Sequence, residues 1–115
     1  MEPVKTEKPW GYEILFANTP HYVGKILFIK KGHRLSLQYH QKKDESLYLY
    51  NGKTRIEIEE KPGTMVTREV GSGFALRIPP NTRHRLEAIE DSTFFEVSTP
   101  ELEDVIRVED DYGRA

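Results

Sequence analysis

The stretch Arg34-Leu35-Ser36-Leu37-Gln38-Tyr39-His40 decides the fold of this protein. Its side chains alternate with a period of two, so the leucines and the tyrosine fall on one face and the polar residues fall on the other. This alternation predicts a β-strand with one buried face. Gln38 and His40 lie on the same face, and both carry lone pairs that can bind a divalent cation.

Short extended runs separated by turn residues continue from this stretch toward both ends of the chain. Gly, Pro and Asn cluster between the runs, and Asn51-Gly52 is typical of a type I′ hairpin turn. Thr99-Pro100-Glu101 is the only helix start that the sequence offers. The expected strands cover residues 11–17, 22–31, 34–40, 46–50, 54–59, 64–70, 74–78, 84–89, 93–98 and 105–108. About eight or more strands at this spacing predict an all-β sandwich or barrel, which also protects sheet edges.

The composition narrows the class of protein. A chain of 115 residues has room for a single domain, residues 1–115. Lys+Arg 17 against Asp+Glu 19 gives a formal net charge of −2, which argues against nucleic acid as a partner. Cysteine is absent, which excludes disulfides and thiolate metal sites. There is no apolar run of about 18 residues for a membrane span and no signal-peptide pattern, so we expect a cytoplasmic protein. The hydrophobic fraction of 37% predicts either a thin core or burial against a partner subunit, so we expect an oligomer, with a homodimer as the first choice.

Two further potential metal ligands follow the 34–40 strand. Glu45 comes five residues after His40, and His84 follows the rigid Pro79-Pro80 turn. Two imidazoles, one carboxylate and one amide oxygen suit Zn, Mn, Co, Fe or Ni better than a metal that prefers thiolates. We therefore expect Gln38, His40, Glu45 and His84 to bind one divalent metal ion, with zinc as the first choice. The alternative is that the two histidines are unrelated core or surface residues.

The spacing of these residues resembles the two motifs of the cupin superfamily. Gln38 stands where the first histidine of that family usually lies. Asn81 replaces a glycine, and asparagine is the next best residue for a left-handed turn. The matching positions are Gly32, Gln38, His40, Glu45 and Gly52 in the first motif, and Gly73, Pro79, Asn81 and His84 in the second. The resemblance implies a small double-stranded β-helix, the jelly-roll barrel of the cupins.

Four segments resemble one cupin family, the type II phosphomannose isomerases, whose domain also forms the C-terminal part of bifunctional mannose-1-phosphate guanylyltransferases. The segments are Pro9-Trp10-Gly11-Tyr12-Glu13, residues 34–40, His84-Arg85-Leu86-Glu87 and Val108-Glu109-Asp110-Asp111-Tyr112-Gly113-Arg114. Together they extend over nearly the whole chain. The resemblance implies a metal-dependent isomerase that interconverts mannose 6-phosphate and fructose 6-phosphate, with a sugar phosphate as its small-molecule partner.

An aldose–ketose isomerase moves a proton between C1 and C2, and it must hold the phosphate with a cation. Arg34 shares the parity of the two strand ligands, so we expect it in the cavity as a ligand of phosphate or enediolate. A salt bridge at the barrel mouth is the alternative for this arginine. Glu96 lies among apolar neighbours, so we expect a raised pKa and a role as general base, unless it is partly exposed and paired with an arginine. Lys30 and Lys43 are weaker candidates.

The other conspicuous residues have structural interpretations. Arg85 has the opposite parity to His84, so we expect it to point out of the barrel. The remaining expectations are a solvated loop at residues 42–44, exposed turns at His21 and His33, and core or interface packing for Tyr48 and Tyr50.

Two other functions are open at this point. Two histidines and one carboxylate are also the ligand set of non-haem Fe(II) oxygenases, although a fourth ligand at Gln38 speaks mildly against that chemistry. A non-catalytic sugar-binding module is favoured by residues 41–47, which keep Glu45 but lack the neighbouring histidine and tryptophan of the isomerases. The isomerase is the first prediction.

Overall fold

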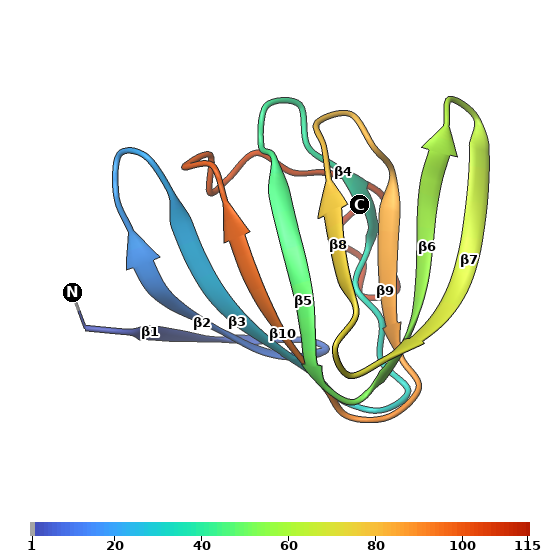
Figure 1. The fold of residues 1–115 in the computed structure, drawn as a ribbon, viewed down its shortest axis with the longest axis horizontal. Helices are drawn as coiled ribbons and strands as arrows, with labels where there is room; N and C mark the ends of the chain where they lie inside the picture. Colours follow the sequence, from blue (N-terminus) through green and yellow to red (C-terminus); the bar gives the residue numbers. More distant parts are fainter. Residues whose placement is uncertain (1) are drawn as a thin grey trace.

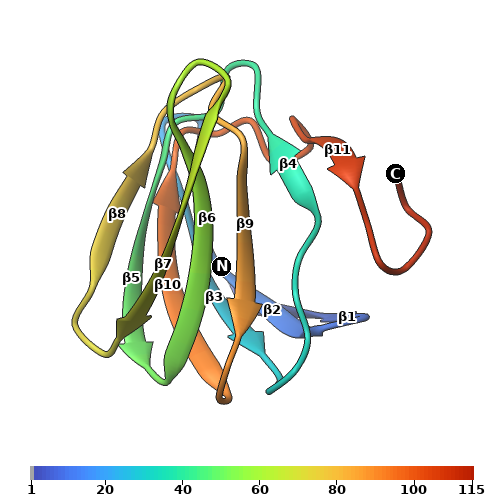
Figure 2. The ribbon, with the colours of Figure 1, turned by 90° about the vertical axis from the view of Figure 1, so that its right-hand side faces the viewer.

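Two antiparallel β-sheets form the computed structural model, which describes residues 2–115. The six-stranded sheet has the order β1-β2-β3-β10-β5-β8, and the five-stranded sheet has the order β11-β4-β9-β6-β7. Figure 2 shows β5 and β8 on one side of the molecule and β4 and β11 on the other. The strands are β1 (Val4–Lys8), β2 (Gly11–Asn18), β3 (Val23–Ile29), β4 (Leu37–Tyr39), β5 (Glu45–Asn51), β6 (Lys53–Lys61), β7 (Thr64–Gly71), β8 (Ala75–Ile78), β9 (His84–Ala88), β10 (Ser92–Ser98) and β11 (Ile106–Glu109). The predicted all-β, double-sheet fold is confirmed.

The facing sides of the two sheets enclose the hydrophobic core. Inward and outward residues alternate along the strands, as in β5, where Leu47 and Leu49 are buried and their neighbours are exposed. The buried apolar cluster consists of Trp10, Leu27, Ile29, Leu47, Leu49, Ile56, Ile58, Ile78, Leu86, Ala88 and Phe94. Removal of this apolar surface from water is the main favourable contribution to folding.

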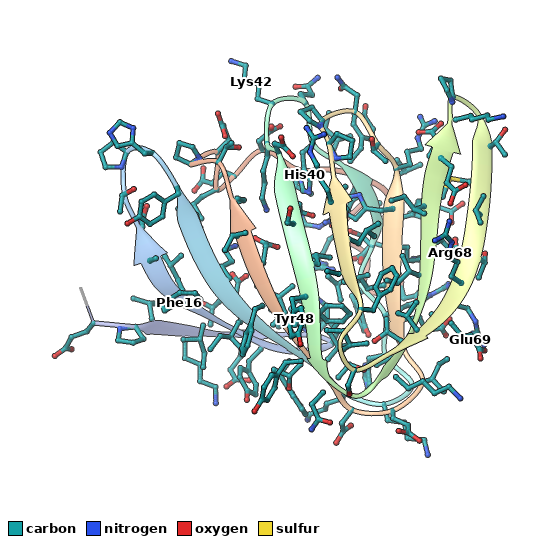
Figure 3. All side chains as sticks on the ribbon, in the orientation of Figure 1. Phe16, His40, Lys42, Tyr48, Arg68 and Glu69 are labelled. Carbon is teal, nitrogen blue, oxygen red and sulfur yellow. The ribbon has the colours of Figure 1, made fainter. Side chains whose placement is uncertain are left out.

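The outer face of the six-stranded sheet carries aromatic residues. Tyr48 and Tyr50 stack on Phe95, with ring centroids 6.4 Å and 5.1 Å apart, and Tyr50 is 60% exposed. Figure 3 shows Tyr48 and Phe16 on this part of the molecule. The predicted core packing of the two tyrosines is therefore wrong, and an interface is the remaining interpretation.

The Asn51-Gly52 pair marks a change of sheet and not a hairpin. β5 pairs with β10 and β8, whereas β6 pairs with β9 and β7 (Figure 1). A type I′ turn needs positive φ at both central residues, and here Gly52 has a φ of 121° while Asn51 has no positive φ. Gly52 is needed because the chain passes close to a neighbouring turn, where an added Cβ would lie 2.4 Å from Asp91 O.

Residues 2–115 contain no helix, so the helix predicted to start at Thr99 is wrong. Thr99 instead forms hydrogen bonds with the loop that precedes β5. Its N–H donates to Asp44 O at 3.0 Å, and its Oγ1 accepts the N–H of Asp44 at 3.0 Å. Residues 100–104 form turns, and so short a segment cannot offset the cost of helix nucleation. Residues 2–115 accordingly contain no helix of the length and hydrophobicity that a membrane span requires.

Candidate metal centre

His40, Glu45 and His84 converge between the two sheets. Glu45 and His84 begin β5 and β9, and His40 follows β4. Their potential ligand atoms all lie within 4.8 Å of one another, and all three residues are buried. Glu45 Oε1 lies 3.6 Å from His40 Nε2 and 3.4 Å from His84 Nε2. Figure 3 shows His40 beneath the loop that carries Lys42.

Backbone contacts position the two ligand segments. Gln38 pairs with His84 across β4 and β9, which aligns the two strands at the site. The turn before β9 is held by the N–H of Asn81, which donates to His40 O at 2.6 Å. Asn81 has a φ of 61°, so the left-handed backbone predicted for this residue is confirmed.

Asp104 holds the loop between His40 and Glu45. Its carboxylate accepts the backbone N–H groups of Gln41, Lys42 and Lys43 at 3.1, 2.6 and 2.9 Å. The N–H groups of Lys42 and Lys43 lower the pKa of Asp104 against the opposing effect of burial. The carboxylate thus remains charged at neutral pH and fixes the loop between two potential ligands.

The histidine side chains are oriented as metal ligands require. His40 Nδ1 contacts Asp104 O at 2.5 Å, and His84 Nδ1 contacts Thr82 O at 2.9 Å. Carbonyl oxygens only accept hydrogen bonds, so Nδ1 is the donor in each histidine, and Nε2 is turned toward the centre. Within residues 2–115, His40 Nε2 is buried and has no hydrogen-bond partner, and Glu45 Oε2 is buried against the ammonium group of Lys43 at 2.9 Å. Convergent donor atoms in this state fit a divalent cation.

Glu45 is ionised in this environment. Burial opposes ionisation, but the contacts with His40 and His84 and the charge of Lys43 outweigh it and hold the pKa of Glu45 well below its ordinary value. A carboxylate that stays charged at neutral pH is available as a metal ligand.

Gln38 and His40 line a cavity with a volume of about 150 Å³. Gln38 Oε1 accepts a hydrogen bond from Ser36 Oγ at 2.6 Å. This location agrees with the predicted position of a fourth ligand, and its binding to metal stays a prediction. A larger groove of about 330 Å³, beside Tyr39 and Arg83, contains none of the predicted ligands.

Lys43 and Glu96 extend the site by a buried ion-pair network. Lys43 Nζ lies 2.9 Å from Glu45 Oε2 and 3.2 Å from Glu96 Oε2. Lys43 is 6% exposed and Glu96 is 5% exposed, so the solvated loop predicted at 42–44 is wrong for Lys43. Glu96 is also not the partly exposed partner of an arginine that was considered as an alternative, because it faces the cavity beside an ammonium group.

The pKa values of Glu96 and Lys43 are both raised. Burial and the nearby Glu45 charge raise the pKa of Glu96, so its carboxyl group holds a proton more readily. Burial would lower the pKa of Lys43, but Glu96 and Glu45 outweigh it and raise the value. The raised pKa expected for Glu96 is thus present, with a lysine as the neighbouring cation.

Arg34 points away from the cavity, so the orientation predicted for it is wrong. Its Nε and Nη2 donate to Asp111 at 2.6 and 2.9 Å, which matches the salt bridge considered as the alternative. The alternation breaks because Leu35 and Ser36, although neighbours, both line internal cavities. Lys30 is exposed beyond the end of β3 and also lies outside the site.

Other residues near the site have structural contacts. Arg85 is buried on the outer side of β9, where its Nε donates to Leu35 O at 2.9 Å. It therefore has the structural role expected from its parity. His33 is half-buried and not in an exposed turn, because its Nδ1 contacts Tyr112 Oη at 2.8 Å, whereas His21 is exposed as predicted.

Two arginines of the cavity wall were missed by the sequence analysis. Arg107 lies on β11 opposite Gln38, and Arg114 comes from the tail that follows. The Tyr112-Gly113-Arg114 motif was visible in the sequence, but nothing local places a terminal segment at an internal cavity. Only the pairing of β11 with β4 brings these residues to the site.

Comparisons with known proteins agree with this architecture. The family model described as "Mannose-6-phosphate isomerase C-terminal" matches residues 2–110. No curated protein sequence matches the chain.

Solved structures share the fold at low sequence identity. KdgF from Halomonas sp. is 22% identical with a TM-score of 0.75, over 87% of this chain and 88% of that chain. CapF from Staphylococcus aureus is 18% identical with a TM-score of 0.80, over 95% and 32%. Oxalate decarboxylase from Bacillus subtilis, a protein with Mn(II) centres, is 17% identical with a TM-score of 0.79, over 93% and 30%. The chain thus spans about a third of the last two proteins. These neighbours are cupins, and the chain belongs to the mannose-6-phosphate isomerase C-terminal family of cupin domains.

Proposed function

We propose that the protein is a metal-dependent sugar-phosphate isomerase that interconverts mannose 6-phosphate and fructose 6-phosphate. One observation carries the proposal: the buried carboxylate of Glu96 lines both the cavity at His40 and the smaller cavity at Glu45 and His84, beside the group of three potential ligands. An isomerase of this class needs a base beside a divalent cation in a site from which water is largely excluded. The family match supplies the substrate class.

Glu96 is the proposed proton carrier. As a carboxylate it takes the proton from C2 of the aldose, and as a carboxylic acid it returns the proton to C1. The hydroxyl proton moves from O2 to O1 in the same sequence, which gives the ketose. Its raised pKa brings the carboxyl group closer to the value that suits both steps. Lys43 lies 3.2 Å from Glu96 Oε2 and positions the carboxylate.

The metal ligands are His40, Glu45 and His84, with Gln38 as the proposed fourth. A bound divalent ion would polarise the substrate carbonyl and stabilise negative charge on its oxygen. Zinc is the proposed metal, and Mn, Co, Fe and Ni also suit two imidazoles and a carboxylate.

The test is an isomerase assay in both directions after metal analysis of the purified protein. Protein loaded with Zn, Mn, Co, Fe or Ni is supplied with mannose 6-phosphate or fructose 6-phosphate. Glu96→Gln should lower kcat by about 10²–10⁴-fold while the bound metal is retained. Glu57→Gln, on the outer side of β6, is the matched control and should have wild-type activity. The absence of interconversion with every metal would overturn the proposal.

The loop at residues 41–47 supports a second candidate, a sugar-binding module without turnover, because it lacks the histidine and tryptophan found beside the glutamate in the isomerases. Binding of a sugar phosphate without isomerisation would favour the module. Oxygen uptake with Fe(II) would instead favour the oxygenase chemistry that the same ligands allow.

The homodimer stays a prediction, and the outer face of the six-stranded sheet supports it. Tyr48, Tyr50, Phe95, Val97 and Phe16 are exposed there, and aromatic faces of this kind favour association. Apolar and aromatic side chains of this kind can pack on the same surface of a second copy about a two-fold axis. Val97→Lys should increase the monomer fraction in analytical ultracentrifugation, whereas Met65→Lys on β7 should not. A monomeric wild-type protein would contradict the prediction.

A further inference from the structure

Arg107 differs from the other arginines in residues 2–115. Its Nε is buried and has no hydrogen-bond partner in this part of the chain. The others pair with carboxylates or lie over an aromatic ring: Arg34 with Asp111, Arg55 with Glu69 and Glu87, Arg68 with Glu60, Arg77 with Asp44, Arg85 with Glu109 and Asp111, Arg114 with Asp110, and Arg83 over Tyr39. Arg107 as a whole is half-buried, and a buried N–H without an acceptor is unfavourable, so this Nε favours the approach of an anion.

The sheet register directs Arg107 toward the metal centre. Arg107 is the direct partner of Gln38 across β11 and β4. Opposite residues of an antiparallel pair project to the same face, and Gln38 lines the cavity beside His40. Arg107 therefore projects into the same cavity, which agrees with its place among the lining residues.

Arg114 adds a second guanidinium to this wall. Asp110 accepts hydrogen bonds from its Nε and Nη2 at 3.0 and 2.9 Å, and the guanidinium lies 5.7 Å from the centre of the Tyr112 ring. These contacts hold the side chain in place, and Nη1 makes no hydrogen bond within residues 2–115. Arg114 is thus a preorganised neighbour of Arg107.

The charges of the cavity leave Arg107 unmatched. Lys8 and Lys25 share Glu13 at 3.6 and 3.0 Å, and Lys43 is paired with Glu45 and Glu96. Since Asp110 neutralises Arg114, Arg107 is the cation of the cavity wall that has no carboxylate partner in residues 2–115. A divalent cation on the three ligands would add further positive charge, and the field would attract an anionic group.

We propose that Arg107, with Arg114 beside it, binds the phosphate group of the sugar phosphate. This inference rests on the proposed function and identifies the part of the site that recognises the substrate's charge. A guanidinium can form two parallel hydrogen bonds with phosphate oxygens, so it selects the phosphorylated sugar over the free sugar. Arg34, the first choice from the sequence, is occupied by Asp111 outside the cavity.

The experiment is isothermal titration calorimetry on zinc-loaded protein with mannose 6-phosphate, inorganic phosphate and free mannose. Arg107→Gln should weaken mannose 6-phosphate binding about 10- to 100-fold, and inorganic phosphate binding in proportion. Arg107→Lys keeps the positive charge but not the planar guanidinium that can form two parallel hydrogen bonds. Its affinity for mannose 6-phosphate should therefore fall less than that of Arg107→Gln. Arg55→Gln, on the outer face, is the matched control and should bind as wild type does. Zinc content should be equal in all four proteins.

The outcomes separate this inference from the proposed function. If Arg107→Gln binds mannose 6-phosphate as tightly as wild type, or if wild type binds it no better than mannose, the phosphate site is wrong. If binding depends on Arg107 but no metal supports isomerisation, the phosphate site stands and the isomerase proposal fails. If isomerisation occurs and neither variant raises KM, the isomerase stands and the phosphate site fails. Should Arg107→Gln not fold, Arg107→Lys decides by the same criteria.

Discussion

The two ends of the barrel differ sharply, although the same strands form both. Along β3, β5, β9 and β10 the inward positions change from polar or charged to apolar. At the end that contains the metal centre, here called the charged end, they are Lys25, Glu45, His84 and Glu96. At the opposite end, here called the apolar end, they are Ile29, Leu49, Ala88 and Phe94, and the buried Ser92 accepts a hydrogen bond from Thr54 there.

This difference separates stability from function. Burial of apolar side chains stabilises the fold, whereas burial of charges costs desolvation that ion pairs only partly offset. Burial of apolar side chains at the apolar end therefore offsets the desolvation cost at the charged end. A barrel selected only for stability would not place two carboxylates and a lysine beside two histidines.

The largest expected effect is at the metal ligands. His84→Ala removes a lone pair from the centre, so we expect the protein to lose stoichiometric metal. The loss of metal affinity should exceed the roughly 10–100-fold that follows when only the hydrogen-bond partner of a ligand is removed. Metal analysis and the zinc-induced rise in Tm measure this change, because a ligand stabilises the folded state that binds it. His21→Ala is the matched control at an exposed histidine. Retention of metal by His84→Ala would refute the assignment of this ligand.

The apolar end should show the converse behaviour. Phe94→Ala leaves a cavity in the core and should lower the free energy of unfolding by about 3–5 kcal/mol. Urea denaturation measures the loss, and zinc affinity of the folded variant should not change. Phe95→Ala, on the exposed side of the same strand, should cost far less. Equal losses for the two variants would remove the distinction between the faces.

Lys43 tests whether the charged end depends on its ammonium group. In metal-free protein Lys43→Met leaves two buried carboxylates without a cation, which should cost about 3 kcal/mol at neutral pH. The exposed Lys42→Met is the control on the same loop.

The pH dependence of this variant has a defined sign. The pKa of Glu96 is raised, so the native state binds its proton more readily than the unfolded state does. Stability of Lys43→Met should therefore increase as pH falls from 7 toward about 5, and decrease as pH rises. Thermal unfolding at several pH values in the presence of a chelator measures the slope of stability against pH. A slope equal to that of wild type would argue that Lys43 does not control Glu96.

The smallest effect is expected at the tail, which lies beside the charged end. Arg114 lowers the pKa of Asp110 from 3.8 to about 2, so the pair stabilises the protein above pH 3.8 and loses this contribution as pH falls through about 2. Asp110→Asn should cost about 1 kcal/mol at pH 7, because Arg114 is partly exposed. Denaturation at pH 7 and near pH 2 compares the proteins, and the difference should shrink in acid. A difference in stability that is the same at both pH values would show that the charge of Asp110 does not cause the loss.

Much of the fold and the metal group could be predicted from local sequence. Alternation placed Gln38 on the cavity side of its strand and Arg85 on the outer side of β9, and motif spacing identified His40, Glu45 and His84. The wrong predictions concern positions where contacts between distant parts of the chain override a local sequence preference. Asn51-Gly52 is typical of a hairpin, but the close approach of Asp91 and the pairing of β6 with β9 make it a corner between sheets.

The sequence by itself determined which side chains alternate inward, where the chain turns and which residues can bind a metal, because dihedral preferences and the two-residue period of a strand are local properties. Only the tertiary structure decided that the charged residues of separate strands meet at one end. It also decided that Arg34 pairs outside with Asp111 and that Arg107 faces Gln38. These contacts depend on the register between strands that are distant in the chain, and packing of the whole barrel sets that register.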